Sequence, residues 1–273
     1  MRTLELAGVH VPVIGQGTWR MGEDDSRRKD EIAALRQGIE LGMTLIDSAE
    51  MYAEGGAEEV VGEAISGQRD KVFLVSKVYP HNASRNGIPQ ACERSLRRLG
   101  TEYIDLYLLH WRGQYPLEET VEAFERLRDE GKIGRWGVSN FDVDDLQELA
   151  NPACATNQVL YKLEERGIEF DLLPWQQNQQ MPLMAYCPIG QGGQMLAHAT
   201  LKNIATRHDA TPAQVALAWI LRQEGVIAIP KAVRPEHVRL NAQAAQLQLQ
   251  PGDLEALDQA FRAPQTKQRL AMV

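Results

Sequence analysis

The sequence of 273 residues contains few cysteines and no long hydrophobic run. Its three cysteines, Cys92, Cys154 and Cys187, are far apart and form no Cys-x-x-Cys pair, so neither a disulfide framework nor a zinc site is indicated, and no metal is expected. Nowhere do eighteen apolar residues follow one another, and no apolar stretch follows the first residues. These absences argue against a membrane-spanning helix and a secretion signal. A reducing, cytoplasmic location is expected.

An excess of positive charge is also missing. Lysine and arginine number 29 and aspartate and glutamate 37, which gives a net charge of −8. A nucleic-acid partner is therefore not expected, because such a protein needs a basic face. Small anionic ligands remain possible, since a few local cations suffice to bind them.

Short β-branched apolar runs alternate along the chain with longer segments of helical period. The eight expected strands are Val13–Ile14, Thr44–Asp47, Val72–Lys77, Ile104–His110, Gly134–Ser139, Thr156–Leu160, Pro182–Tyr186 and Val226–Pro230. No linker rich in Pro, Gly or Ser interrupts the pattern. It predicts an α/β fold in which residues 1–273 form one domain, a single (β/α)8 TIM barrel. A doubly wound open sheet is the alternative.

The ends of the chain add two further elements to this barrel. Thr3–Leu6 and Val9–Val11 flank Ala7-Gly8 and predict an N-terminal β-hairpin that plugs the N-terminal mouth of the barrel. Helix starts are marked by Asp142 and by the Thr211-Pro-Ala-Gln capping box. Pro235–Gln246 is expected to be the last helix, followed by a tail from Pro251 onward.

Polar side chains stand where several apolar strands end, about one βα unit apart. These are Asp47, Lys77, His110, Ser139 with Asn140, and Gln158. Each taken singly has a plain structural explanation, such as a helix cap or a solvated strand end. In a TIM barrel the C-terminal strand ends meet at one mouth, so we expect these side chains to lie close together in one concave site there, which we call the cup.

Asp47, Tyr52, Lys77 and His110 together form a proton-donating set. A tyrosine has a pKa of about 10 in water, too high for an effective acid at neutral pH. An ammonium beside it stabilises the phenolate and lowers that pKa, and a carboxylate holds the ammonium in place. We therefore expect Lys77 and Asp47 to tune Tyr52, and His110 to orient a carbonyl oxygen.

Ordered motifs from about residue 4 to residue 260 resemble those of the aldo-keto reductase family. They are Gly15-Gln-Gly-Thr-Trp19, Ile46-Asp-Ser-Ala-Glu-Met-Tyr52, Val75-Ser-Lys77, Leu106-Tyr-Leu-Leu-His-Trp111, Gly137-Val-Ser-Asn-Phe141, Asn157-Gln158, Ala185-Tyr-Cys-Pro188 and Ile229-Pro-Lys231. Within the family the sequence is most similar to bacterial methylglyoxal reductases of the YeaE type. The resemblance implies a (β/α)8 barrel that binds NADPH and reduces aldehydes or ketones to alcohols.

By position, the resemblance assigns roles to individual residues. Asp47, Tyr52, Lys77 and His110 match the catalytic tetrad, with Tyr52 as proton donor. The residues that it implies for the cofactor NADPH/NADP+ are Gly17, Thr18, Trp19, Asp47, Ser139, Asn140, Gln158, Tyr186, Pro188, Gly190, Lys231, Ala232, His237 and Asn241. Among these, Ser139, Asn140 and Gln158 match the partners of the nicotinamide amide, Tyr186 the stacking ring and Lys231 the cation at the adenosine 2′-phosphate. For a small carbonyl substrate the wall is expected to comprise Trp19, Tyr52, Tyr79, His110 and Trp111.

The sequence departs from the family pattern at the adenosine end. Ala232 stands where most members have serine, and His237 stands where arginine is usual. We therefore expect NADPH to be preferred over NADH less strongly than in most relatives, with Arg234 as a compensating cation. Cys187 and the glycine run after Pro188 are expected near the pyrophosphate, since glycine lets backbone N–H groups approach it.

The expected reaction is the NADPH-dependent reduction of small aldehydes or α-oxoaldehydes such as methylglyoxal, by a monomer. A short tail from about Pro264 predicts a shallow pocket that suits small substrates. Two alternatives remain: a non-catalytic, nucleotide-binding redox-sensing barrel, and a reductase of a larger ketone. A barrel hydrolase is disfavoured, because the strand ends carry only one carboxylate and one imidazole. The basic runs Arg27-Arg-Lys29 and Arg94–Arg98 are expected to be solvated helix faces.

Overall fold

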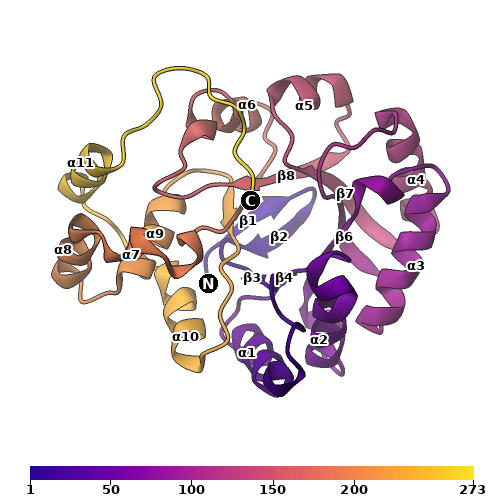
Figure 1. The fold of residues 1–273 in the computed structure, drawn as a ribbon, viewed down its shortest axis with the longest axis horizontal. Coiled ribbons are helices and arrows are strands. Elements are labelled where there is room, and N and C mark those ends of the chain that lie inside the picture. Colours follow the sequence, from indigo (N-terminus) through magenta and orange to yellow (C-terminus); the bar gives the residue numbers. More distant parts are fainter.

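The computed structural model describes residues 1–273, in which eight parallel strands form one sheet surrounded by helices (Figure 1). Each strand pairs with the next along the chain, from β3 to β10. The strands are β3 (Gln16–Gly17), β4 (Leu45–Asp47), β5 (Phe73–Val78), β6 (Ile104–Leu109), β7 (Ile133–Ser139), β8 (Cys154–Leu160), β9 (Leu183–Tyr186) and β10 (Val226–Ala228). Seven of the eight lie where the sequence predicts them, with ends that differ by one or two residues.

The first and last strands meet and curl the sheet into a barrel. Ile14 bridges to Ala228 in parallel, and the Gly15 and Gly17 N–H groups donate to the carbonyl oxygens of Ala228 (2.9 Å) and Pro230 (3.1 Å). The open-sheet alternative is therefore wrong. The first strand is Gln16–Gly17 rather than Val13–Ile14. A Cβ on Gly17 would lie 2.7 Å from the Ile229 carbonyl oxygen, so this close pairing requires a glycine, which β-propensity does not register.

Eleven α-helices accompany the strands. They are α1 (Arg28–Glu40), α2 (Gly56–Ile65), α3 (Gly87–Leu99), α4 (Leu117–Asp129), α5 (Val143–Leu149), α6 (Leu172–Asn178), α7 (Gln194–Ala197), α8 (Ala199–Arg207), α9 (Pro212–Ile220), α10 (Pro235–Ala244) and α11 (Pro251–Ala260). Asp142 caps α5 and Thr211 caps α9, as expected. None of the helices is long and apolar enough to cross a membrane.

Helix α11 corrects the expectation of a tail from Pro251 onward. Gln250 and Asp253 form a reciprocal capping box, and proline occupies the first helical position. Leu257 is fully buried on the inner side. The capping box and the burial of Leu257 therefore stabilise this helix. Its apolar face is too narrow to stand out in the sequence as a helical stripe. Helix α10 ends at Ala244, two residues before its expected end.

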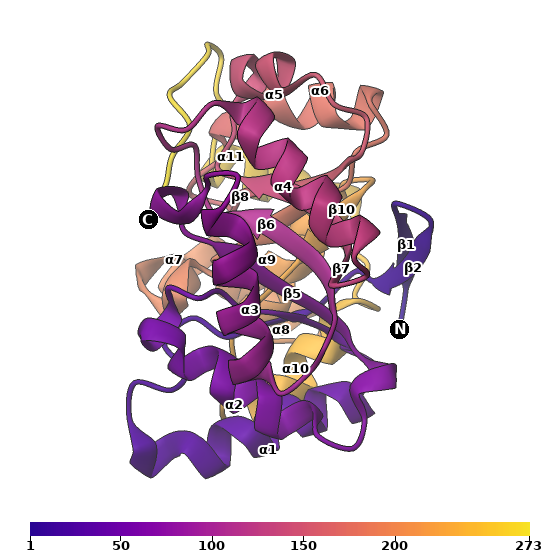
Figure 2. The same ribbon diagram turned by 90° about the vertical axis from the view of Figure 1, so that its right-hand side faces the viewer.

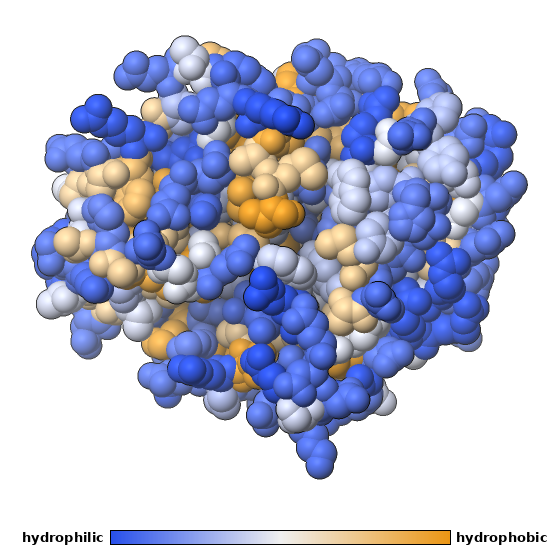
Figure 3. Space-filling view, in the orientation of Figure 1, coloured by the Kyte–Doolittle hydropathy of each residue, from blue (hydrophilic) through white to orange (hydrophobic).

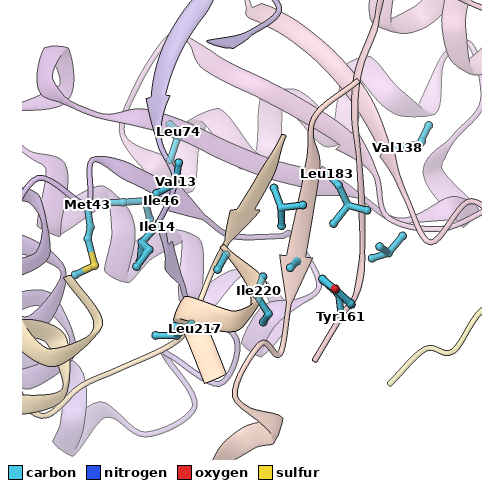
Figure 4. Packing of buried hydrophobic residues seen from close by; sticks show 14 of the residues in the cluster. Val13, Ile14, Met43, Ile46, Leu74, Val138, Tyr161, Leu183, Leu217 and Ile220 are labelled. Carbon is cyan, nitrogen blue, oxygen red and sulfur yellow. The ribbon is translucent and has the colours of Figure 1, made fainter. Parts of the chain in front are cut away.

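Two separate apolar clusters hold the barrel together. The larger one, of 60 buried residues, fills the layer between the strands and the helices (Figure 4). The smaller one fills the inside of the barrel, where Leu6 and Val11 of the N-terminal hairpin pack against strand residues such as Leu45. This hairpin consists of β1 (Thr3–Leu6) and β2 (Val9–Pro12) and lies at one end of the molecule, while the C-terminus lies at the opposite side (Figure 2). The prediction of a plug at the N-terminal mouth is confirmed, so the other mouth is left for chemistry.

Candidate active site

The C-terminal mouth of the barrel gathers the tetrad predicted from the strand ends. Asp47 is the last residue of β4, Lys77 lies at the end of β5, and His110 follows β6 directly. Tyr52 comes from the loop after β4. The Lys77 Nζ donates to Asp47 Oδ2 (2.8 Å), to the Ser48 carbonyl oxygen (2.8 Å) and to the Tyr52 hydroxyl (3.0 Å). The three donors of one ammonium thus fix the phenol next to an ion pair.

This ion pair is shielded from solvent. The side chains of Lys77 and Asp47 are 0% and 2% exposed. Burial lowers the pKa of Lys77, while the carboxylate of Asp47 raises it. The other oxygen of Asp47 accepts from Gln158 Nε2 at 2.7 Å. Burying an ion pair is costly unless its remaining polar atoms also form hydrogen bonds. Here both carboxylate oxygens of Asp47 have partners, so the pair is held in a fixed position.

The pKa of Tyr52 is shifted upward, whereas the sequence led us to expect a lower pKa. Burial, and secondarily the negative charge of Asp47, raise the pKa of Tyr52 well above its ordinary value. The Lys77 ammonium does not reverse this, because Asp47 at 2.8 Å already neutralises much of its field. The phenol is therefore fully protonated at neutral pH, which is the form that a proton donor needs.

His110 is a neutral imidazole in this environment. Burial, with a smaller effect from the positive charge of Lys77, lowers the pKa of His110 to about 2. Its Nδ1 is buried without a hydrogen-bond partner. The ring stands edge-on to that of Tyr52, with centroids 5.8 Å apart. A neutral imidazole and a phenol therefore face the same space, as two groups that bind one oxygen atom would.

The polar residues expected at the nicotinamide amide connect directly to this tetrad. The Ser139 hydroxyl donates to the Gln158 carbonyl oxygen (2.8 Å), and Gln158 donates to Asp47. Asn140 Nδ2 donates to the His110 carbonyl oxygen (3.1 Å), and the Tyr186 hydroxyl donates to Asn140 Oδ1 (2.9 Å). Burial raises the pKa of Tyr186. The structure thus brings these four residues together beside the tetrad.

A cleft of about 560 Å³ opens next to this inner group. Its lining includes six of the residues expected to contact the cofactor: Trp19, Pro188, Lys231, Ala232, His237 and Asn241. The other eight lie outside the lining: Asp47, Ser139, Asn140, Gln158 and Tyr186 belong to the inner group described above, and Gly17, Thr18 and Gly190 lie elsewhere. Thr18 is fully buried and donates to the Asp47 carbonyl oxygen, Gly17 pairs with β4, and Gly190 stands in the loop after β9.

The outer end of the cleft carries one lysine without an ion-pair partner. Lys231 is half-buried and forms no ion pair. Burial lowers its pKa, the positive charges of Arg27 and Arg20 act in the same direction, and the carboxylates of Glu31 and Glu23 oppose them. A lysine that is not held by a carboxylate is a suitable contact for a phosphate.

Comparison with known proteins agrees with this geometry. The model of the aldo/keto reductase family matches residues 13–262. The chain belongs to this family. It is 58% identical to the methylglyoxal reductase YeaE of Escherichia coli, over 97% of this chain and 96% of the relative, and 34% identical to the glyoxal reductase of Bacillus subtilis, over 92% and 89%. An aldo/keto reductase from Klebsiella pneumoniae, crystallised with NADP and acetate, is 54% identical and superposes with a TM-score of 0.98 over 99% of both chains.

Sequence reasoning missed several residues of this aldo/keto reductase. Arg20 lines the cleft and lies over the Trp19 ring at 4.9 Å, next to a residue that was predicted. Arg27 is exposed, in agreement with the expected solvated face. Arg94 and Arg98 differ from that expectation, since they pair with Glu50 and Glu58, two buried carboxylates. No local pattern distinguishes these arginines from solvated ones, because their partners are distant in sequence.

Four residues of the expected substrate wall, Tyr52, His110, Trp111 and Tyr79, form a row of neighbouring aromatic rings, while Trp19 lines the cleft. His110 and Trp111 lie with ring centroids 4.9 Å apart, and Tyr79 meets Trp111 edge-on at 5.8 Å. The tail reaches this mouth despite its shortness. Lys267 pairs with Asp142 and Asp171 on the rim.

Figure 1 places the C-terminus over the centre of the barrel, and Figure 3 shows an apolar patch there within a hydrophilic rim. The tail therefore helps to cover the mouth of the barrel. The prediction of a shallow pocket, made from the shortness of the tail, did not take this cover into account.

Proposed function

We propose that this protein is an NADPH-dependent reductase of small aldehydes and α-oxoaldehydes such as methylglyoxal, with Tyr52 as proton donor. The observation that carries the proposal is the buried Lys77 ammonium, which hydrogen-bonds both the Tyr52 hydroxyl and Asp47. A positioned, protonated phenol beside an ammonium suits the transfer of a proton to an oxygen that is gaining negative charge.

When bound, NADPH supplies the hydride that reduces the carbonyl carbon. The neutral His110 imidazole donates a hydrogen bond to the carbonyl oxygen and so orients the substrate. Tyr52 gives its proton to the same oxygen as negative charge develops on it. Lys77 stabilises the phenolate that is left, and Asp47 holds Lys77 in place. One aldehyde, one NADPH and one proton thus yield one alcohol and one NADP+.

The residues present fit this cofactor at both ends. Ser139, Asn140 and Gln158 offer amide and hydroxyl groups for the nicotinamide amide, and the Tyr186 ring offers a stacking surface. Lys231, which lines the cleft together with Arg20, is assigned to the 2′-phosphate. His237 and Ala232 line the same end, so we expect a preference for NADPH that is weaker than in most relatives.

The proposed substrate class rests on the wall and on the relatives. Trp19, Tyr52, Tyr79, His110 and Trp111 supply aromatic rings around the cup, which favour compact carbonyl compounds through apolar contact and exclusion of water. Two relatives that cover most of this chain are named for methylglyoxal and glyoxal reduction.

The proposal is tested by following NADPH absorbance with methylglyoxal, glyoxal, a longer aldehyde and a bulky cyclic ketone, with NADH as a parallel coenzyme. We expect the highest kcat/KM for a small α-oxoaldehyde with NADPH. NADPH binding without turnover of any carbonyl compound would favour the redox-sensing alternative. A higher kcat/KM for the bulky ketone would favour the reductase of larger substrates, and equal or better use of NADH would overturn the coenzyme assignment.

A further inference from the structure

Helix α3 carries two arginines that reach the segment on which Tyr52 stands. Arg94 and Arg98 are four residues apart and therefore share one face of the helix. Arg98 Nε and Nη2 lie 2.7 and 2.6 Å from Glu58 Oε2, and Arg94 Nη2 lies 3.5 Å from Glu50 Oε2. Since Glu50 precedes Tyr52 in the loop and Glu58 follows it in the first turn of α2, helix α3 contacts the chain on both sides of the proton donor.

Both carboxylates are buried, unlike most ion-paired glutamates. The side chains of Glu50 and Glu58 are 6% and 0% exposed. Removing a buried carboxylate from water is costly unless it is fully hydrogen-bonded. Glu58 meets this condition through Ser76, whose hydroxyl donates to Oε1 at 2.5 Å, as well as through Arg98. Ser76 directly precedes Lys77, so the same carboxylate links α2, the helix that directly follows the Tyr52 loop, to the strand that carries the ammonium.

Glu50 makes a corresponding link to the substrate wall. Its Oε1 accepts from the Tyr79 N–H at 2.8 Å and from Asn82 Nδ2 at 2.9 Å. The backbone N–H of Glu50 donates to the Lys77 carbonyl oxygen at 3.2 Å. One side chain therefore ties the Tyr52 loop to the loop after β5, which carries the Tyr79 ring.

The backbone between the two glutamates needs such support. Ala53, Glu54 and Gly55 follow Tyr52 with φ values of 50°, 53° and 98°. Left-handed residues other than glycine are strained, and they persist only where surrounding contacts determine the conformation. The Arg98 guanidinium lies directly against Gly55, where a Cβ atom would collide with it.

From these contacts we infer that Arg94 and Arg98, through Glu50 and Glu58, are positioning residues that hold the Tyr52 hydroxyl against Lys77. This inference rests on the proposed function for its kinetic consequence. Its structural content, a left-handed turn held in place by helix α3, does not depend on the reaction.

The test uses the full-length protein and the variant R98M, which keeps the apolar stem and removes the charge. R97M is the matched control, because Arg97 is an exposed neighbour on the same helix. We expect R98M to lower kcat about tenfold, since a small misplacement of a catalytic group has effects of this size. KM for NADPH stays within twofold, and the solvent deuterium isotope effect on kcat rises because proton transfer becomes slower. R98K restores most of the rate, and R97M behaves as the wild type.

A loss of folding is separated from a loss of positioning by two further measurements. The double variant E58Q/R98M leaves no unpaired buried charge, so it is expected to fold, and its kcat stays low because the clamp is absent. Hydrogen–deuterium exchange of the amides of residues 52–55 is faster in R98M and in the double variant than in R97M. The inference is overturned if the amides of residues 52–55 exchange at the wild-type rate in both variants, or if the double variant has the wild-type kcat. Absence of turnover by the wild type overturns the proposed function instead, and the exchange result still decides on the clamp.

Discussion

Two lysines in this barrel, Lys77 in the cup and Lys231 at the outer end of the cleft, carry the same charge in different surroundings. Lys77 is fully buried, and its three donors already have acceptors within the protein. Lys231 is half-buried and makes no ion pair, and both cations (Arg27, Arg20) and carboxylates (Glu31, Glu23) lie in its neighbourhood. The first charge organises the protein around the reacting atoms, while the second remains free for an anionic ligand. Changes in the cup should therefore affect turnover and stability, and changes at the outer end should affect coenzyme binding.

The largest effect is expected from Y52F, which removes only the hydroxyl that contacts Lys77. Loss of a positioned general acid lowers kcat by about 10²–10⁴-fold, while the Kd for NADPH stays within twofold because the cofactor contacts remain. Steady-state kinetics and fluorescence titration with NADPH measure the two quantities. Tyr115 is an exposed tyrosine, so Y115F serves as the control. Turnover by Y52F at more than a tenth of the wild-type rate contradicts the role given to Tyr52.

K77M tests whether the inner lysine organises its surroundings. The substitution leaves the Asp47 carboxylate buried without its cation, which destabilises a protein by about 3–5 kcal/mol. D47N/K77M removes the remaining charge and should recover much of the free energy of unfolding, although not the activity. Urea unfolding followed by circular dichroism measures this, with exposed Lys71 giving the control K71M. Equal free energies of unfolding for K77M and K71M would show that Lys77 stabilises the fold no more than an exposed lysine does. The contrast drawn between Lys77 and Lys231 would then be wrong.

The low pKa of His110 predicts a pH dependence of stability in the cup. The folded-state pKa is about 2, below the ordinary histidine value of about 6.5, so the unfolded chain binds the proton first as pH falls. The free energy of unfolding therefore decreases below pH 6.5 by about 1.4 kcal/mol per pH unit from this group.

Urea unfolding at pH 7.5 and pH 5 should show a smaller decrease for H110Q than for the wild type, by about 2 kcal/mol. H10Q, which changes an exposed histidine, should retain the wild-type decrease. An identical decrease in H110Q and the wild type would mean that His110 is charged in the folded protein.

The smallest effect is expected at the outer lysine. K231M should raise KM for NADPH about tenfold, the size of one lost charge-assisted contact to phosphate. KM for NADH and kcat should stay within twofold, because NADH lacks the 2′-phosphate and the cup is unchanged. K29M, at an exposed position of α1, is the control. A change in kcat, or an equal rise in KM for both coenzymes, would remove the distinction between the two lysines.

The sequence predicted the cup better than its surroundings. Asp47, Lys77 and His110 follow apolar strands at intervals of one βα unit, so their convergence follows from the barrel itself. Tyr52 lies in a loop, where periodicity says nothing, and it was placed by the resemblance to the family. The strand at Gln16–Gly17 was missed because it depends on a close glycine contact rather than on β-branched residues.

Long-range electrostatics could not be predicted from local patterns. Arg98 stands in a basic run of ordinary appearance, and only the fold brings the buried Glu58 to it, 40 residues away in the chain. The pKa of Tyr52 was expected to fall, because Lys77 was considered without its partner. Burial and the ion pair with Asp47 decide that direction, and both depend on the three-dimensional structure.

The central claim is that the cup directs a hydride to the carbonyl carbon while Tyr52 protonates the oxygen. It is tested most directly by incubating the protein with methylglyoxal and NADPH carrying deuterium at the transferable C4 position, and by analysing the product by NMR. We expect one deuterium bonded to the new carbinol carbon with the wild type, and formation of the labelled alcohol at least about a hundredfold more slowly with Y52F. A labelled alcohol formed equally fast by Y52F, or an alcohol without deuterium at that carbon, would contradict the account.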